Sequence, residues 1–408
     1  MKTITFLRDN APWLGAGVLL TFLSSFGQTF FISIFAGEIR ESFGLTHGQW
    51  GGIYSLGTTV SAIVMVWAGG LTDQFRVRGL GAIILALLMI SCMSMALNPV
   101  WWLLPVVIFA LRFTGQGMTS HLAVVAMARW FTATRGKALA VATLGFAAGE
   151  ALLPLLFVTL MVFIDWRILW VLAGVIALAG IPVLMLLLRH ERTPQSHAGS
   201  EQAVGMEARN WTRNQAFRHW LFWFMVPALL GPSAFNTAFF FHQVHFATLK
   251  SISHIELVAF FPFYTAVSIA AMMFSGWALD KVGTARLIPF MQLPMVAAFL
   301  TFALAHSAWG LSLGFLFLGL NTGMNTTLPA AFWAEFYGTR HIGSIKAMAA
   351  AVMVFGSAIG PGITGLGIDL GLGLERQYIG VAGFFVVSTI LMTIGIRRAQ
   401  PFLPLRAS

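Results

Sequence analysis

Long apolar stretches recur along the chain and alternate with short polar connections. A helix that crosses the hydrocarbon core of a bilayer needs about 20 predominantly apolar residues. Twelve stretches of this kind fall near residues 12–36, 48–70, 79–97, 101–128, 136–164, 167–188, 219–246, 254–279, 285–305, 309–334, 342–368 and 377–396. The pattern therefore predicts an all-α membrane protein with twelve transmembrane helices.

The predicted helices fall into two related halves. Gly69-Gly-Leu-Thr-Asp73 follows the second stretch, and Gly276-Trp-Ala-Leu-Asp280 follows the eighth, at an offset of 207 residues, the difference between 280 and 73. The same offset relates further pairs, namely Trp102 with Trp309, Gly136 with Gly343, Gly149 with Gly356 and Pro154 with Pro361. A constant offset over several spans indicates duplicated six-helix bundles.

A polar segment separates the two halves. Residues 189–218 hold charges of both signs together with Pro194 and Gly199, and they are too few and too polar to form a domain. We therefore predict a cytoplasmic linker at 189–218 between bundles at 1–188 and 219–408.

The composition and the placement of charge fit this picture. The chain is 58% hydrophobic and 9% charged, against about 25% charged in a typical soluble domain. Arg112 lies inside a span, and only four other Lys or Arg residues fall in predicted outer loops: Arg40, Arg167, Lys250 and Arg376. Cytoplasmic loops carry the excess of Lys and Arg, so we predict a bacterial inner (plasma) membrane protein with both termini in the cytoplasm. The net charge of +10 then reflects orientation, and no nucleic-acid partner is expected.

The loop motifs resemble those of the major facilitator superfamily. Gly69-x-x-x-Asp73-x-x-Arg76 is similar to that superfamily's signature loop, with Arg76 where glycine is usual, and the second half repeats the motif from Gly276 to Arg286. The resemblance implies the major facilitator fold and transport by alternating access. It also implies that the two loops act as conformational switches through Gly69, Asp73, Arg76, Gly276, Asp280, Gly283 and Arg286.

Two further stretches extend the resemblance. Arg112-Phe-Thr-Gly-Gln116-Gly in the fourth span is similar to the Arg-x-x-x-Gly pattern of that helix in the superfamily. Ala128-Arg-Trp-Phe131, followed by Arg135-Gly, looks like the monocarboxylate and oxalate–formate type porters. The second likeness points to an organic anion as the transported solute.

Two charged residues lie deep in predicted spans. Arg112 is 11 residues after Trp101, roughly 17 Å from the outer interface at about 1.5 Å per residue. A charge at that depth costs at least about 2.5–3.5 kcal/mol, so it should face a cavity or a partner. Glu150 lies at a similar depth in the fifth span. Either the two form a buried ion pair that fixes helix packing, or Arg112 binds an anion while Glu150 carries a proton.

Several polar residues are candidates for lining a cavity. Gln116 follows Arg112 at the i, i+4 spacing of one helix face, and Asn321 and Asn325 share a face of the tenth span. Gln28 in the first span and Asn236 in the seventh occupy similar sequence contexts. By the resemblance, spans one, four, seven and ten line the central cavity, so these residues become substrate-binding candidates. Each one, taken alone, is more often an interhelical hydrogen bond than a contact to a ligand.

The motifs of enzymes are absent from the sequence. It has no phosphate-binding Gly-x-x-x-x-Gly-Lys-Ser/Thr loop, no metal-ligand spacing, no catalytic constellation and one cysteine, Cys92. We therefore predict no enzyme activity, no cofactor and no metal. The favoured hypothesis is a secondary active transporter that carries a small organic anion by proton coupling or exchange, with a proton or counter-solute and the lipid bilayer as its other partners. The alternatives are a proton-driven drug or metabolite exporter and a membrane sensor that transports nothing.

Overall fold

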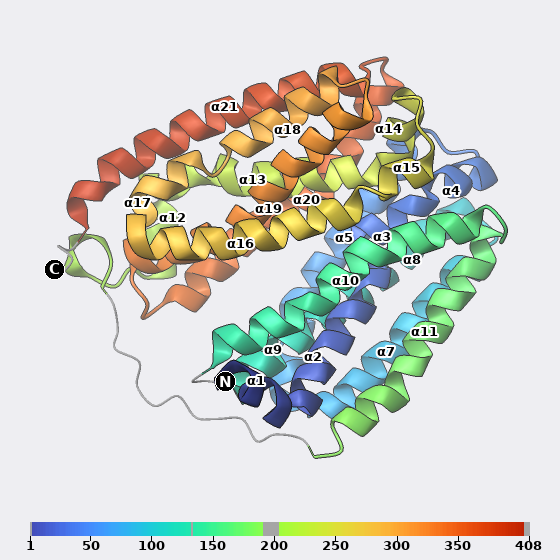
Figure 1. Ribbon diagram of the computed structural model, residues 1–408, viewed down its shortest axis with the longest axis horizontal. Coiled ribbons are helices and arrows are strands. Elements are labelled where there is room, and N and C mark those ends of the chain that lie inside the picture. The colour runs from blue at the N-terminus through green and yellow to red at the C-terminus, as the bar shows by residue number, and fades with distance from the viewer. Residues whose placement is uncertain (1, 132–133, 191–203, 404–408) are drawn as a thin grey trace. The chain divides into compact units, whose positions relative to one another are not determined.

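The regular structure consists entirely of helices over the part of the chain that is described (Figure 1). The computed structural model describes residues 2–131, 134–190 and 204–403. It divides into two compact units, the first of Met1–Ala198 with Phe240–Ala259 and the second of Gly199–Phe239 with Phe260–Ser408. Residues 240–259, which follow the predicted linker in the chain, therefore pack with the first unit. Residues 191–203 of that linker lie outside the described residues.

The helices of the first unit follow the predicted spans. They are α1 (Lys2–Asp9), α2 (Ala11–Leu23), η1 (Ser24–Gly27), α3 (Thr29–Ile32), η2 (Ser33–Phe35), α4 (Ala36–Phe43), α5 (His47–Ala68), α6 (Leu71–Gln74), α7 (Val77–Leu97), η3 (Trp101–Leu103), α8 (Leu104–Leu111), η4 (Arg112–Thr119), α9 (Ser120–Trp130), α10 (Arg135–Met161), α11 (Trp166–Leu187), α14 (Gln243–Leu249) and α15 (His254–Val258).

The helices of the second unit repeat the same succession. They are η5 (Met206–Ala208), α12 (Arg213–Arg218), α13 (Trp220–Phe241, whose last two residues belong to the first unit), α16 (Phe261–Val282), α17 (Thr284–Leu287), η6 (Ile288–Phe290), α18 (Leu293–Leu304), α19 (Ala308–Tyr337), α20 (Ile342–Asp369), α21 (Leu374–Ala399) and η7 (Gln400–Phe402).

Most of the predicted spans are long and apolar enough to cross a membrane. Within the described residues nine helices meet this condition, and ten do if the bent pair Ala11–Gly27 and Thr29–Phe43 counts as one span. The two other predicted spans correspond to the interrupted helix α8–η4–α9 and to α19, which has 30 residues. Both contain the polar residues that the sequence marked as candidates, and this lowers their apolar character.

Large apolar side chains project from the helices instead of being buried. Examples with more than two thirds of their surface exposed are Val66, Trp67, Phe163, Leu186, Met273, Leu304 and Trp309. A soluble protein rarely exposes so much contiguous apolar surface. These faces are suited to contact with lipid chains.

Each unit pairs its spans in the same way. In the first unit α5 packs against α8, α7 against α11, and α2 against α10. In the second unit α16 packs against α19 and α18 against α21, while glycines of α20 approach α13 closely. Figure 1 shows α7 beside α11 and α18 beside α21. The duplication predicted from the constant offset thus extends to helix packing.

Glycines bring the paired helices into backbone contact. A Cβ atom built on Gly149 of α10 would lie 3.0 Å from Ser25 Cβ, and one on Gly356 of α20 would lie 2.7 Å from the Leu230 carbonyl oxygen of α13. Small residues allow such close packing in membrane proteins, where lipid supplies no hydrophobic drive for helix association. Gly149 and Gly356 are one of the pairs at the 207-residue offset.

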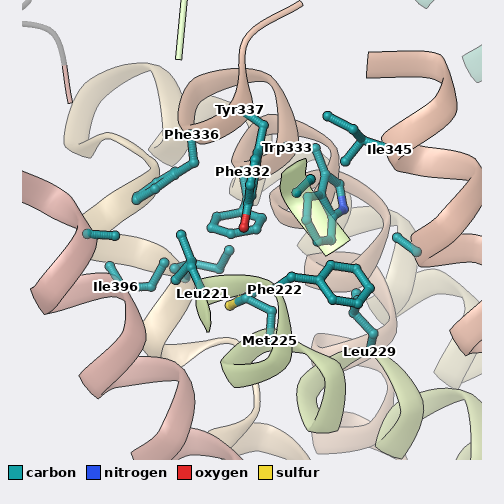
Figure 2. Close-up of a cluster of buried hydrophobic side chains, with 14 of the residues drawn as sticks. Leu221, Phe222, Met225, Leu229, Phe332, Trp333, Phe336, Tyr337, Ile345 and Ile396 are labelled. Carbon is teal, nitrogen blue, oxygen red and sulfur yellow. The ribbon is translucent and has the colours of Figure 1, made fainter. Parts of the chain in front are cut away.

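The second unit contains a cluster of buried apolar side chains at one end of α13, α19, α20 and α21 (Figure 2). Phe222 of α13 and Trp333 of α19 have ring centroids 5.9 Å apart. Ile345 of α20 and Ile396 of α21 complete the cluster and are fully buried. These four helices are therefore joined at one end by side-chain packing.

The described end of the predicted linker is folded against this cluster. We call Gly205–Trp211 the linker clip. The backbone N–H of Trp211 donates to the Tyr337 carbonyl at 3.0 Å, and the Arg340 N–H donates to Asn210 Oδ1 at 3.3 Å. Trp211 is 5% exposed, so the clip is part of the core of the second unit.

The backbones of η1 and η4 approach each other closely at Gly27 and Gly115. A Cβ on Gly27 would lie 2.7 Å from the Gly115 Cα. We expect Gly27→Ala to lower the free energy of unfolding by about 1–3 kcal/mol, because overpacking forces the two segments apart. The melting temperature of the purified protein measures this change.

The matched control for this prediction is Gly52→Ala in α5. A Cβ at Gly52 would have no neighbour within 4 Å. Alanine in a compatible helical position stabilises a protein by about 0.4–1 kcal/mol, so the control should melt at or above the parent temperature. Equal melting temperatures for Gly27→Ala and the parent protein would refute the close packing.

Candidate functional site

The first span is interrupted at Gln28. The stretches Ala11–Gly27 and Thr29–Phe43 meet at 47°, and Gln28 between them has an extended backbone, with φ −86° and ψ 154°. A break inside a span frees backbone groups from their helical partners, and the bilayer interior offers no water to replace them. Carbonyl groups next to the break therefore need donors from neighbouring spans.

Arg112 supplies that donor. Its Nη1 lies 3.1 Å from the Gly27 carbonyl oxygen and 3.3 Å from Thr29 Oγ1. The side chain is 1% exposed, and its guanidinium carbon lies 5.4 Å from the centroid of the Tyr54 ring. The buried Nε has no hydrogen-bond acceptor among the described residues. Arg112 is thus held by neutral groups on both sides of the break.

Two residues that the sequence analysis missed complete this arrangement. Tyr54 of α5 is fully buried, and its hydroxyl lies 2.5 Å from Thr29 Oγ1. Thr29 therefore contacts both Arg112 and Tyr54. No sequence pattern separates Tyr54 from an ordinary packing aromatic, whereas the position of Thr29 directly after Gln28 was a signal that could have been used.

Gln28 and Gln116 lie at the same break. Gln28 is 9% exposed, and the backbone nitrogen of Gln116 would be 2.8 Å from a Cβ on Gly27. The segment Arg112–Thr119 is a π-helix, so the α-helical spacing used to place Gln116 beside Arg112 does not apply there. π-Helical turns are frequent at functional sites. The structure thus brings Arg112, Gln28 and Gln116 to one place.

Glu150 lies on α10, which packs against η1 and α3, the two segments that flank the break. It is 8% exposed and follows Gly149, which is in contact with Ser25 of η1. The Arg112 guanidinium contacts the Gly27 carbonyl, Thr29 and Tyr54. Arg112 and Glu150 therefore approach the interrupted segment of the first span from two different helices, η4 and α10.

The amide candidates of the second unit form a network of their own. Asn321 Nδ2 donates to the Met291 carbonyl at 2.7 Å and lies 3.3 Å from Gln292 Oε1. Asn325 Nδ2 donates to Asn321 Oδ1 at 2.6 Å. Asn321 is therefore engaged in interhelical hydrogen bonds. Asn236 is half-buried, and its Oδ1 has no donor among the described residues.

The first switch loop is held by Arg129 of α9. Its Nη1 donates to the Thr72 carbonyl at 2.8 Å, and Thr72 Oγ1 donates to the Gly69 carbonyl at 2.8 Å. The side chain of Asp73 lies outside the described part of the structure. Arg76, at the start of α7, has φ −69° and ψ 140°, a conformation open to any residue. This explains why arginine is accommodated at this position.

The second switch loop differs at the corresponding glycine. Gly283 ends α16 with φ 85° and ψ 157°, a region that is essentially restricted to glycine. Asp280 and Arg286 are exposed, and Lys281 Nζ lies 4.7 Å from the Trp277 ring centroid. Gly276 has open space around it, since a Cβ there would meet only Thr327 at 4.0 Å. Offset-related positions in the two loops therefore have different backbone conformations.

The chain belongs to the Major Facilitator Superfamily, whose family model matches residues 17–361. A bacterial homologue of the human lysosomal transporter Spinster, in an inward-facing and occupied conformation, has a similar structure with a TM-score of 0.74, 15% identity and coverage of 97% of this chain and 98% of that one. Its inward-facing, unoccupied form has a TM-score of 0.72 and 16% identity, and the match covers 98% of this chain and 99% of that one. A mutant form of the nucleoside transporter NupG has a TM-score of 0.72 and 13% identity, and the match covers 94% of this chain and 99% of that one. No curated protein sequence matches the chain.

These comparisons confirm the major facilitator fold that the loop motifs predicted. The chain is therefore a multi-pass integral membrane protein and a transporter of that superfamily. At these identities the structural likeness concerns the fold alone.

The two loops give a prediction about backbone strain. Gly283→Ala should lower the free energy of unfolding by about 1–3 kcal/mol, because alanine is forced into a region of φ and ψ that it rarely adopts. Arg76→Ala, the offset-related control, should change the free energy by no more than about 0.5 kcal/mol, because the residue is exposed and its φ is negative. Thermal unfolding of the two variants measures the difference. If both variants lost a similar free energy of unfolding, backbone strain at Gly283 would be ruled out as the cause.

Proposed function

We propose that this transporter carries a small organic anion through alternating access, by proton coupling or exchange, and that Arg112 binds the anion. One observation supports this most directly: a fully buried guanidinium at a broken span is held by a carbonyl, a hydroxyl and an aromatic ring. These neutral partners satisfy part of its hydrogen-bonding capacity and leave its charge to be compensated by a ligand.

The chemistry of the guanidinium favours a carboxylate. Its planar set of donors matches two carboxylate oxygens, and such charge-assisted pairs are roughly twice as strong as neutral hydrogen bonds. The Nε of Arg112 is an available donor, because it has no acceptor among the described residues. Gln28 and Gln116 lie beside the same break and would add amide contacts to the anion.

Glu150 is the proposed proton carrier. It is buried in α10 next to the glycine that contacts η1, so the interrupted segment lies between its helix and that of Arg112. Protonation of Glu150 would accompany binding of the anion to Arg112.

The second half and the loops have supporting roles in this proposal. Asn236, whose buried Oδ1 has no donor in the part of the chain that the structure describes, is a candidate to contact the solute. Asn321 and Asn325 would contact it after a rearrangement of their hydrogen bonds. The switch loops would be remade between inward-open and outward-open states. We place the protein in a bacterial inner membrane with both termini in the cytoplasm, as the distribution of Lys and Arg suggests.

Reconstitution into liposomes that contain a pH-sensitive dye tests the proposal. A panel of carboxylates is added, and counterflow of a labelled carboxylate detects exchange that moves no protons. We expect one or more carboxylates to drive uptake in the parent protein. Arg112→Gln should lose about 10- to 100-fold in apparent affinity, which corresponds to the loss of a hydrogen bond to a charged group, about 1.5–3 kcal/mol. Glu150→Gln should lose the proton signal.

Arg167→Gln is the matched control. Arg167 also donates to two carbonyl groups, those of Ala96 and Asn98, and stacks on an aromatic ring, that of Trp166, but it lies at the start of α11, away from the break. Carboxylate uptake should survive this change. Failure of every carboxylate, together with proton movement driven by hydrophobic cations, would overturn the anion assignment and favour a proton-driven exporter.

A further inference from the structure

The segment Phe240–Ala259, which we call the strap, connects the two units in an unusual way. It packs with the first unit, whereas the chain before it, to Phe239, and after it, from Phe260, belongs to the second. The strap contains the end of α13 together with α14 and α15. Movement of one unit relative to the other must therefore either detach the strap or bend the chain at its two ends.

The strap is attached beside the Arg112 site. Gln243 is fully buried, and its Nε2 lies 2.7 Å from Ser33 Oγ and 3.3 Å from the Phe30 carbonyl oxygen. Phe30 belongs to α3, the four-residue helix that also contains Thr29. The ring of Phe241 lies 4.6 Å from that of Tyr54. The strap therefore contacts the elements that carry both neighbours of Arg112.

Three histidines meet where the strap crosses the start of α5. The His47 ring centroid lies 4.3 Å from that of His245 and 6.0 Å from that of His242. Within the described residues, no group of three or more such side chains is arranged to hold a metal ion. Histidine is the side chain that titrates nearest to neutral pH, so the three rings form a cluster of proton-binding groups.

The surroundings of His245 oppose a positive charge. Burial is the main cause that lowers the pKa of His245, and the nearby charge of Arg40 on α4 lowers it further. Among the described elements that form the strap or pack against it, α4 carries Glu38 and Glu41, α15 carries Glu256 and α10 carries Glu150.

The lowered pKa of His245 shows that burial and Arg40 outweigh any attraction by these carboxylates. Glu256 accepts hydrogen bonds from Ser253 in a capping box. Other ionisable groups on or beside the strap are His254 on α15 and Lys250 at the end of α14. The η2 segment that packs against α14 contains only Ser33, Ile34 and Phe35.

We propose that the cluster of His47, His242 and His245 is a proton-operated latch, and that protonation from the predicted outer side releases the strap from the first unit. Two protonated rings at 4.3 Å, next to Arg40, would repel each other across the contact between α14 and α5. Release would also withdraw Gln243 and Phe241 from the elements around Arg112. The latch would thus couple external acidity to the geometry of the Arg112 site, whatever solute that site binds.

The direction of the pH effect follows from linkage. The attached strap lowers the pKa of His245, so the released state binds protons more readily and gains population as the pH falls. The shift toward the released strap begins near the ordinary histidine pKa of about 6.5. It is complete below the lowered pKa that His245 has in the attached state. Each unit of pKa difference alters the ratio of released to attached strap about tenfold.

Pulsed EPR between spin labels on Ser42 of α4 and Thr248 of α14 tests the latch. Both residues are exposed, and the single native thiol, the fully buried Cys92, is removed as Cys92→Ala. Measurements in lipid nanodiscs at about pH 8 and about pH 5.5 bracket the ordinary histidine pKa. We expect a short distance between the labels at high pH, and a second population with a longer distance at low pH. No substrate is needed, so this result is independent of the test of anion transport.

Two histidine variants make the test decisive. His47→Asn with His245→Asn should keep the short distance at both pH values, whereas His306→Asn, a change at an exposed histidine of the second unit, should retain the shift. Melting temperatures verify folding, and glutamine replaces asparagine if the double variant is unstable. Identical distances at both pH values in the labelled parent, or a shift that persists in the double variant, would overturn the proposal.

Discussion

A backbone group inside a membrane must find its hydrogen-bond partner within the protein, and this constraint organises the first half of the molecule. The first span breaks at Gln28, and the Gly27 carbonyl next to the break accepts a hydrogen bond from Arg112. A guanidinium buried among apolar helices would be costly without acceptors. Each defect compensates the other, so the broken span and the buried charge are one structural feature.

Glycine makes this compensation possible. Gly27 and Gly115 bring the backbones of the first and fourth spans into contact, and Gly149 brings the fifth span against the same segment. The interrupted turn is thus clamped between two helices that carry Arg112 and Glu150. Substitution at these glycines should change the position of the charged groups as well as helix packing.

The fold was largely predictable from the sequence because its determinants are local or repeated. Apolar length indicates the spans, and the constant offset indicates the duplication. The depth of Arg112 in its span stays a prediction from residue counting, while the structure shows that its side chain is buried among the helices. The break at Gln28 was not predictable, because it contains no proline and depends on the contact of Gly27 with a distant helix. Tyr54 was missed for the same reason, since its neighbours come from other spans.

The two halves share their helix pairing and differ in their polar chemistry. The first half surrounds its break with a guanidinium, hydroxyls and a carboxyl group. The second half joins its helices through amides, with Asn321 donating to Gln292 and to the Met291 carbonyl. Duplication has therefore preserved the apolar frame, while the buried charged side chains Arg112 and Glu150 both lie in the first half.

The linker clip has a consequence for biosynthesis. Asn210 and its partner Arg340 are 130 residues apart in the chain, and a ribosome that adds about 5–20 residues per second needs on the order of ten seconds to make that stretch. During this interval Trp211 has no Tyr337 to pack against. The clip therefore cannot close until α13, α16, α18 and α19 have all been made, and its closure precedes the synthesis of α20 and α21 at the earliest.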